Sequence, residues 1–329
     1  MRKLDILIPI YNETEEVVKP LLDSIAIQQN INLQEDVGVI ICCDGGTATI
    51  SEEFKSNYPF EIEFYQCEHK GVSATRNACL DHSKAKYVMF CDCDDMFYNA
   101  CGLWIVFREM KTGFDGLVSV FIEETKDPET KQTMYINREM DSTFVHGKIY
   151  RRKYLIKKEI RWNDNLTIHE DSYFNILCQN LSQNIKYCPT SFYLWKWRDN
   201  SVCRHDPKYI LKTYNNMLDS NEQLILEFMR RGMTDKAMFY TAFMIFDAYY
   251  TMNKEEWLNQ ENQEYRTKTE KRFSQWFKEK KSMWESIPIN DKMMISNQVR
   301  SRSVMEGMRM EAITIDDWLK HIETLGGTE

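Results

Sequence analysis

Three carboxylates follow a short apolar run in the stretch 87–95, which reads Y-V-M-F-C-D-C-D-D. Asp92, Asp94 and Asp95 have no lysine or arginine between them, so their negative charges repel one another. Such crowding either raises the carboxyl pKa values or is relieved by a hard divalent cation held among the oxygens. The stretch therefore predicts a cation site. The alternative is a solvated turn in which Asp95 caps the following helix.

Three further polar groups lie next to predicted strands or helices. They are Tyr11-Asn12-Glu13, Asp44-Gly45-Gly46, and Gly71 with Arg76 in the segment G-V-S-A-T-R-N. Each is a weak signal by itself, since an aspartate before two glycines is more often only a turn. In a parallel sheet, however, the carboxyl ends of the strands share one edge. We therefore expect the first two groups to converge with the Asp92 cluster.

Short apolar runs alternate with helical patterns over the first 110 residues. The predicted strands are Leu4–Ile10, Val37–Cys43, Ile62–Gln66 and Tyr87–Cys91, and the predicted helices are Glu13–Gln29 and Gly71–Ala85. This alternation indicates right-handed βαβ crossovers, and hence an α/β fold with a largely parallel sheet. Because successive residues of a strand face opposite sides, Asp92 and Asp94 converge only if the fourth strand breaks before them.

The pattern is looser between residues 110 and 207, and only helical periodicity remains after that. The middle part is expected to contain a strand at Gly116–Glu124 with a hairpin partner at Tyr135–Ile136, a helix at Glu170–Gln179 and a strand at Phe192–Trp197. The expected C-terminal helices are Tyr209–Arg231, Asp235–Met252, Glu261–Trp284 and Thr314–Leu325. A helical region is therefore predicted at residues 207–329.

The motifs resemble those of glycosyltransferase family 2 in their order and spacing. The matching segments are P-I-Y-N-E at 9–13, C-D-G-G at 43–46, G-V-S-A-T-R-N at 71–77, F-C-D-C-D-D at 90–95, H-G-K-I-Y-R-R at 146–152, H-E-D-S-Y-F at 169–174 and W-R-D-N-S at 197–201. The resemblance covers residues 3–205 and implies the GT-A fold, a Rossmann-like, mostly parallel sheet flanked by helices. It implies a catalytic domain at 1–206, with a nucleotide-binding half at 1–110 and an acceptor half at 111–206.

By this resemblance the chain is an inverting enzyme that moves a sugar from a UDP-sugar to a hydroxyl of an acceptor, with Mn²⁺ or Mg²⁺ bound. The residues implied to bind the nucleotide-sugar are Pro9, Tyr11, Asn12, Glu13, Asp44, Gly71, Arg76, Asp92, Cys93, Arg198 and Ser201. Asp44 suits uracil, since a carboxylate accepts the imide N–H. Asp94 and Asp92 would hold the metal, with His205 as a weaker ligand. For Arg76 the alternative is a structural salt bridge to the aspartate cluster.

Glu170 and Asp171 resemble the family's catalytic acidic pair. Inverting transfer needs one carboxylate that takes a proton from the acceptor hydroxyl as it attacks the anomeric carbon. The resemblance gives this role to Asp171 and an orienting role to Glu170. The alternative is an acidic first helical turn, which the helix dipole favours. His169 stands where the family often has glycine, so the acceptor side is expected to differ here.

Several other side chains have both a functional and a structural interpretation. Arg198 suits bidentate contact with phosphate oxygens. His146 and His205 suit metal, phosphate or acceptor contact, although a lone histidine is more often structural. Trp195 and Trp197 suit stacking on a sugar, although core packing is the commoner role. The basic segment 146–161 suits a phosphate-bearing acceptor, with a solvated helix face as the alternative.

Composition narrows the remaining classes. The formal charge of −8 argues against a protein held on nucleic acid by bulk charge. Ten cysteines without C-x-x-C spacing indicate reduced, mostly buried thiols. No segment reads as a membrane span, so a cytoplasmic protein is expected. The favoured acceptors are glycans and cell-wall polymers, with nucleic acid as a further candidate.

Two other functions are compatible with some of these motifs, namely nucleotidyl transfer and non-catalytic binding of sugar nucleotides or carbohydrates. A nucleotidyltransferase would need a basic, glycine-rich loop after the first strand, where this chain has the acidic segment Y-N-E-T-E-E. A non-catalytic module that binds sugar nucleotides or carbohydrates would not need the aspartate cluster together with the Glu170-Asp171 pair. Both rivals are therefore less favoured than a glycosyltransferase.

Overall fold

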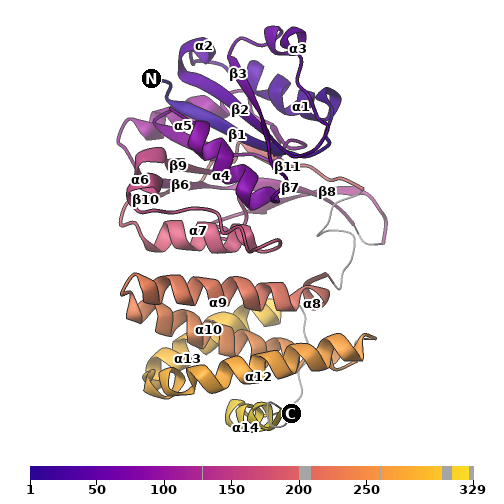
Figure 1. Cartoon of the computed structure of the whole chain (residues 1–329), viewed down its shortest axis with the longest axis vertical. Helices are drawn as coiled ribbons and strands as arrows, with labels where there is room; N and C mark the ends of the chain where they lie inside the picture. Colours follow the sequence, from indigo (N-terminus) through magenta and orange to yellow (C-terminus); the bar gives the residue numbers. More distant parts are fainter. Residues whose placement is uncertain (128, 200–208, 260, 306–312, 326–329) are drawn as a thin grey trace. The chain divides into compact units, whose positions relative to one another are not determined.

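The computed structural model describes residues 1–329 except 128, 200–208, 260, 306–312 and 326–329. The chain divides into two compact units, residues 1–202 and 203–329. The first unit is α/β and the second contains only helices in its described part (Figure 1). Within the described residues, every helix is too short or too polar to cross a bilayer.

A seven-stranded sheet forms the centre of the first unit, in the order β10-β6-β9-β4-β1-β2-β3. Its strands are β1 Leu4–Ile10, β2 Val37–Asp44, β3 Glu61–Cys67, β4 Tyr87–Phe90, β6 Gly116–Ser119, β9 Lys148–Arg151 and β10 Ile185–Cys188. Its pairs are parallel except for those of β9, which runs antiparallel to β4 and β6. Every residue of β2 and β4 is buried, as expected for apolar strands covered on both faces. The predicted α/β fold is therefore confirmed.

Helices flank this sheet (Figure 1). They are α1 Glu15–Ala26, α2 Leu33–Asp36, α3 Glu52–Ser56, α4 Val72–His82, α5 Gly102–Met110, α6 Arg152–Lys157 and α7 Glu170–Asn180. The apolar face of α1 is buried through Val18, Leu21, Leu22 and Ile25. Helix α4 packs on β1 and β2, which places its N-terminus at the edge where those strands end.

A second, four-stranded sheet lies beside the carboxyl end of the central sheet, in the order β5-β11-β7-β8. Its strands are β5 Met96–Phe97, β7 Phe121–Lys126, β8 Thr133–Arg138 and β11 Tyr193–Trp195. The single strand predicted at Gly116–Glu124 is wrong, because the chain changes sheets at Val120. Before it, β6 pairs with β9 and β10; after it, β7 pairs with β11 and β8. The hairpin partner predicted at Tyr135–Ile136 lies within β8.

The basic segment 146–161 is not a single solvated helix face. Its first part is β9, whose Lys148 side chain is fully buried. Its second part is the short helix α6, followed by a loop in which Arg161 pairs with Asp81. Strand periodicity over four residues is too short to separate β9 from a helix in the sequence.

The second unit contains α8 Tyr209–Lys212, α9 Tyr214–Arg230, α10 Thr234–Met252, α11 Glu255–Leu258, α12 Gln263–Ser286, α13 Ile289–Met305 and α14 Ile315–Leu325. Helix α10 is its centre and contacts α9, α12 and α13. Helices α11 and α13 were not predicted. In α13 the apolar residues do not follow one face, since Met293 and Met294 are exposed while Ile295 and Val299 are buried.

Candidate active site

The aspartate cluster lies in a tight turn directly after β4. The strand ends at Phe90, and the amide of Asp95 donates to the carbonyl of Asp92 at 3.2 Å. Because the strand has ended, the side chains of Asp92, Asp94 and Asp95 are not fixed to alternate faces of a sheet, as they would be in a continuing strand. The side chains of Asp92 and Asp94 are 35% and 20% exposed, whereas Asp95 is fully buried. Two carboxylates are thus open to solvent at the edge of the sheet.

Arg76 joins this cluster to the acidic pair of α7. Its guanidinium donates to Asp92 Oδ1 at 3.1 Å, Glu170 Oε1 at 2.9 Å and Asp171 Oδ1 at 3.0 Å. The same group lies over the ring of Trp162, with 4.4 Å between Cζ and the ring centroid. Burial acts to lower the pKa of Arg76, but the three carboxylates outweigh it and raise that pKa. The salt bridge considered from the sequence is therefore present, and it brings together residues more than 70 positions apart.

Asp171 is held on both of its carboxylate oxygens. Oδ1 accepts from Arg76, and Oδ2 accepts from the backbone N–H of Val145 at 3.0 Å. Burial raises the pKa of Asp171 to about 7, although the charge of Arg76 acts in the opposite direction. The Asp171 side chain keeps 19% of its surface exposed, so a carboxyl with a raised pKa is accessible here to exchange a proton near neutral pH.

His169 caps α7 with a left-handed backbone, at a φ of 63°. Glycine adopts this conformation without steric cost, which agrees with the glycine that the family resemblance led us to expect at this position. The departure noted in the sequence is therefore a feature of the turn that leads into Glu170. The left-handed backbone at His169 is visible only in the structure, because the sequence does not show backbone torsions.

Asp95 is not the cap of the next helix, so that alternative is wrong. Helix α5 begins at Gly102 and is capped by Cys101. The carboxylate of Asp95 instead accepts from Tyr193 Oη at 2.6 Å and from the amide of Lys196 at 3.0 Å. Burial raises the pKa of Asp95, and the charges of Asp92 and Asp94 add to this effect. Asp95 thereby fixes the second sheet beside the aspartate turn.

Asp94 forms an ion pair with Arg198, whose Nη1 lies 3.0 Å from Asp94 Oδ2. Burial raises the pKa of Asp94, and the neighbouring Asp92 contributes in the same direction. Arg198 is 42% exposed, so its guanidinium also borders solvent. The predicted contacts Ser201 and His205 lie outside the described residues.

The chemistry of the cluster fits a divalent cation. One ligand atom each from Asp92, Asp95 and His146 lie within 4.8 Å of one another. His146 Nδ1 is buried without a hydrogen-bond partner and lies 3.4 Å from Asp95 Oδ2. Burial lowers the pKa of His146 to about 3, so the imidazole is neutral, which is the form that binds metals. The sequence named His146 as a candidate but did not group it with Asp95.

The ring of His146 is held by aromatic neighbours from the second sheet. It stacks on Trp195 and Tyr193, with centroid distances of 4.7 Å and 5.5 Å. Trp195 thus packs partly into the protein, as the structural interpretation expected, and remains half-buried at the edge of the site.

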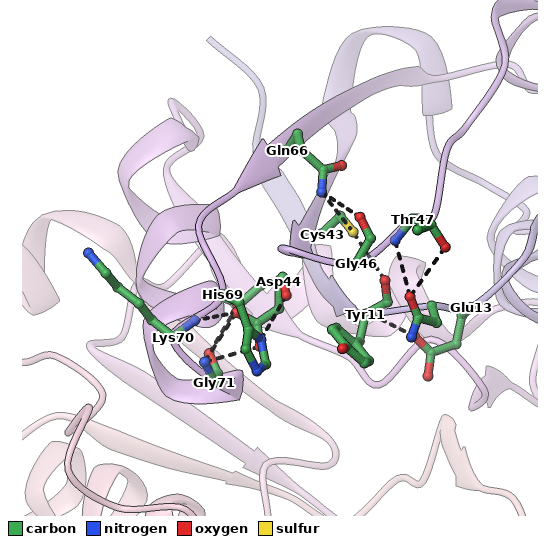
Figure 2. Close-up of polar contacts among 12 residues, drawn as sticks. Tyr11, Glu13, Cys43, Asp44, Gly46, Thr47, Gln66, His69, Lys70 and Gly71 are labelled. Atoms are coloured by element: carbon green, nitrogen blue, oxygen red, sulfur yellow. Dashed lines mark hydrogen bonds and ion pairs between the residues drawn. The ribbon is translucent and has the colours of Figure 1, made fainter.

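The loops after β1 and β2 are tied together at the same edge (Figure 2). Asn12 Oδ1 accepts from the amide of Thr47 at 3.1 Å, and Glu13 Oε2 accepts from the amide of Tyr11 at 2.7 Å. A Cβ on Gly46 would lie 1.8 Å from the carbonyl oxygen of Tyr11, so only glycine allows this approach. The second glycine after Asp44 therefore has a packing role beyond a generic turn.

Asp44 binds the loop that opens α4, as Figure 2 shows. Its carboxylate accepts from the amides of Lys70 at 2.8 Å and Gly71 at 3.0 Å, and lies 3.1 Å from His69 Nδ1. The exposed ring of Tyr11 lies 5.2 Å from the ring of His69. The amide of Gly71 also lies 3.1 Å from Oδ1, so each oxygen of Asp44 already has two contacts, and a ligand N–H would have to share or replace one of them.

The remaining nucleotide candidates lie around this edge. Pro9 pairs with Cys42 across β1 and β2, and Gly71 caps α4 with a φ of 90°. Cys93 is buried, and Glu13 lies close enough to raise its pKa after the larger effect of burial. Within the described part of the chain, the sequence-predicted residues therefore gather at the carboxyl edge of the central sheet. Sequence reasoning missed the roles of Val145, Lys148 and Tyr193, whose partners are distant in the chain.

Comparison with known proteins shows the family of this chain. The family described as "Glycosyl transferase family 2" matches residues 5–177. Glycosyltransferase GlyA of Streptococcus pneumoniae serotype 4 is 27% identical over 228 residues, which is 61% of this chain and 32% of that protein. The minor teichoic acid biosynthesis protein GgaA of Bacillus subtilis is 27% identical over 186 residues, which is 51% of this chain and 41% of that protein. The chain thus spans a minor part of these relatives' length.

Solved structures show the same fold. The crystal structure of S. aureus TarS 1–349 matches with a TM-score of 0.62 at 15% identity, covering 98% of this chain and 90% of that one. TarS 1–349 in complex with UDP-GlcNAc gives a TM-score of 0.61 at the same identity and coverage. The family match includes more than half of the chain. The chain therefore belongs to glycosyltransferase family 2 and has a GT-A fold.

Proposed function

We propose that this family 2 glycosyltransferase moves a sugar from a UDP-sugar to a hydroxyl of a glycan or cell-wall polymer, with inversion and with a divalent cation. The observation that carries the proposal is the position of Arg76, which links Asp92 of the proposed donor side to Glu170 and Asp171 of the proposed acceptor side. One site thus contains a cation-binding cluster and a base within reach of each other.

The proposed donor site uses the edge formed by the ends of β1, β2 and β4. Asp44 is the proposed acceptor for the imide N–H of uracil, which would replace the contact of the exposed His69. Tyr11 offers an exposed ring beside it for the base. The TarS complexes with UDP and UDP-GlcNAc support the choice of uridine nucleotide, since TarS has the same fold.

The diphosphate is proposed to lie over the aspartate turn. Asp94 and Asp92 would hold a cation such as Mn²⁺ or Mg²⁺. The group of possible ligands in the structure is Asp92 with Asp95 and His146, whereas Asp94 pairs with Arg198 and would have to turn from it to the cation. When bound, the cation neutralises charge on the leaving diphosphate. Arg198 is placed to contribute a second positive charge, because its half-exposed guanidinium already lies at Asp94. Ser201 and His205 stay predictions for the same region.

The proposed transfer is a single displacement. Asp171, in its ionised form, accepts the proton of the acceptor hydroxyl while the oxygen attacks the anomeric carbon and the bond to the diphosphate breaks. Glu170 orients the hydroxyl, and Arg76 keeps both carboxylates in place. A single base suffices for this chemistry, which supports inversion of the anomeric centre.

The acceptor is proposed to be a polymer of the cell wall. GgaA is named for minor teichoic acid biosynthesis, and its similarity covers half of this chain. Nucleic acid stays a less favoured candidate, and the cytoplasmic location expected from the sequence stays a prediction. The second unit has no assigned role.

Asp171→Asn tests the proposed base. The variant should bind UDP as the wild type does, but transfer the sugar roughly 10²- to 10⁴-fold more slowly, because the amide cannot accept the proton. UDP affinity is measured by calorimetry, and transfer is measured by UDP release and product mass spectrometry across a panel of UDP-sugars with and without Mn²⁺. Transfer at the wild-type rate in this variant would contradict the role of Asp171.

A further inference from the structure

Lys148 is a buried lysine on the central strand β9, close to the proposed base. Its side chain is fully buried, and burial lowers the pKa of its ammonium to about 8, although the charges of Asp141 and Asp171 act in the opposite direction. Lysine is almost never fully buried without a compensating partner. The nearest carboxylate, Asp141 Oδ1, lies 3.8 Å away and already accepts three hydrogen bonds from Thr143 and Phe144. The ammonium therefore has a weak ionic partner, and its main contact lies elsewhere.

That main contact is the backbone carbonyl of Phe144, which accepts a hydrogen bond from Lys148 Nζ. The same peptide group carries the N–H of Val145, which donates to Asp171 Oδ2 at 3.0 Å. In a planar trans peptide the C=O and the N–H point in opposite directions. The peptide thus stands between the ammonium and the carboxylate, with one hydrogen bond on each side.

Hydrogen bonds in such a chain polarise one another. A cation on the carbonyl oxygen draws electrons from the amide and makes its N–H a stronger donor. The ring of Phe121, 5.9 Å from Nζ, helps to exclude water from the ammonium. A neutral donor would satisfy the Phe144 carbonyl equally well, so the buried charge needs a separate reason.

The rest of the loop is fixed by other groups. Asn175 Nδ2 donates to the carbonyl of Thr143 at 2.7 Å, and Asn175 Oδ1 accepts from Tyr150 Oη at 2.7 Å. Asp141 closes the turn at residues 141–144. The contact of Lys148 is therefore directed to the peptide whose N–H donates to Asp171, whereas Asn175 and Asp141 fix the rest of the loop.

We propose that Lys148 is a positioning residue for sugar transfer, which acts on Asp171 through the peptide that joins Phe144 to Val145. The ammonium fixes and polarises this peptide, so that the N–H of Val145 orients Oδ2 and stabilises the ionised carboxylate. The inference rests on the proposed function, since it needs Asp171 as the base.

Lys148→Met keeps the apolar stem and removes the ammonium. It should lower kcat about 10- to 100-fold, the effect of one buried hydrogen bond lost at the base, while the KM for the UDP-sugar changes little. Lys148→Gln keeps a neutral donor for the carbonyl and should also lower kcat. Lys111→Met, at an exposed lysine directly after α5 and outside the basic segment, is the matched control and should keep the wild-type kcat.

A double-mutant cycle with Asp171→Asn separates positioning from general structure. In the Asp171→Asn background, Lys148→Met should have little further effect on the residual rate. An equal loss of kcat in both backgrounds would overturn the inference, because the lysine would then act independently of Asp171. If Lys148→Met has a wild-type kcat while Asp171→Asn loses transfer, the inference about Lys148 is overturned and the proposed function is not.

A different result would contradict the proposed function. If Asp171→Asn retains full transfer, the base assignment fails whatever Lys148 does. Thermal melting and UDP binding of each variant establish that it is folded before kcat is compared. If Lys148→Met does not fold, Lys148→Gln carries the test, and a wild-type kcat in that folded variant would refute the role of the charge.

Discussion

The site is defined at the residue scale by carboxylates whose environments differ. Asp92 shares the cation of Arg76, and its pKa is lowered although burial acts to raise it. Asp171 shares the same cation but is more strongly affected by burial, which raises its pKa. Carboxyl groups whose pKa values are moved apart can take different roles in one reaction. Asp92 is suited to hold positive charge, and Asp171 to exchange a proton.

The pH dependence of transfer follows from the pKa of Asp171. The base must be ionised, so kcat/KM should fall as the pH falls through the region near 7, instead of near the ordinary aspartate value of about 4. His146 should not contribute, since its pKa is lowered to about 3 and it stays neutral over this range. A pH profile of kcat/KM measures this.

The raised pKa of Asp171 affects the stability of the fold in the opposite direction to its effect on transfer. A carboxyl whose pKa is raised in the folded protein stabilises the fold at low pH, and this contribution is lost as the pH rises through the folded value.

The control for the pH profile is His146→Gln, which should leave the acidic limb of kcat/KM at the same pH. An acidic limb near pH 4 in the wild type would contradict the raised pKa of Asp171.

At the scale of elements, Arg76 connects parts of the chain that local structure leaves separate. It is on α4, and its partners are in the turn after β4 and in the first turn of α7. The acidic first turn of α7, considered as a dipole effect, is thus also half of an ion-pair network. The buried guanidinium of Arg76 thus connects α4, the turn after β4 and the start of α7.

Arg76→Met should destabilise the protein by up to about 3 kcal/mol, because it leaves three partly buried carboxylates close together without their shared cation. The loss should shrink at acidic pH, where those carboxylates take up protons. Arg161→Met is the matched control: it breaks an exposed ion pair with Asp81 and should cost about 0–1 kcal/mol. Urea denaturation at two pH values compares them, and equal losses for both variants would argue against the network.

On the scale of the whole molecule, the family match lies within the first unit. The second unit has its own core around α10 and no polar cluster of the kind found at the end of β4 among its described residues. The proposed halves at 1–110 and 111–206 stay predictions. Their residues meet at Arg76, so neither half contains the proposed site alone.

Nucleotide binding should be visible in the melting temperature of the whole chain. If Asp44 accepts the imide N–H of uracil, UDP should raise the melting temperature more than CDP or GDP at the same concentration. A ligand at 100 times its Kd adds about 2.7 kcal/mol of stability, a shift of several degrees. Thermal shift assays with Mn²⁺ present test this, and equal shifts for the three nucleotides would remove Asp44 as the uracil contact.

The sequence by itself determined where the four strands of the first 110 residues begin and end, and which polar groups follow them. Leu4–Ile10 was predicted with the bounds of β1, and the second and fourth strands were within one residue at their ends. Apolar runs and turn residues act over a few positions, so they can be recognised locally. The same runs placed Asp44 and Asp92 at one edge, because parallel strands share it.

Only the tertiary structure decided the pairing of side chains across that edge. Asp95 reads locally as a helix cap, but its partners are Tyr193 and Lys196, about 100 residues away. Lys148 reads as part of a solvated basic segment, but it lies in the core behind Asp171. Burial and long-range contacts decide which charges are paired and which pKa values move, and neither leaves a periodic signal in the sequence.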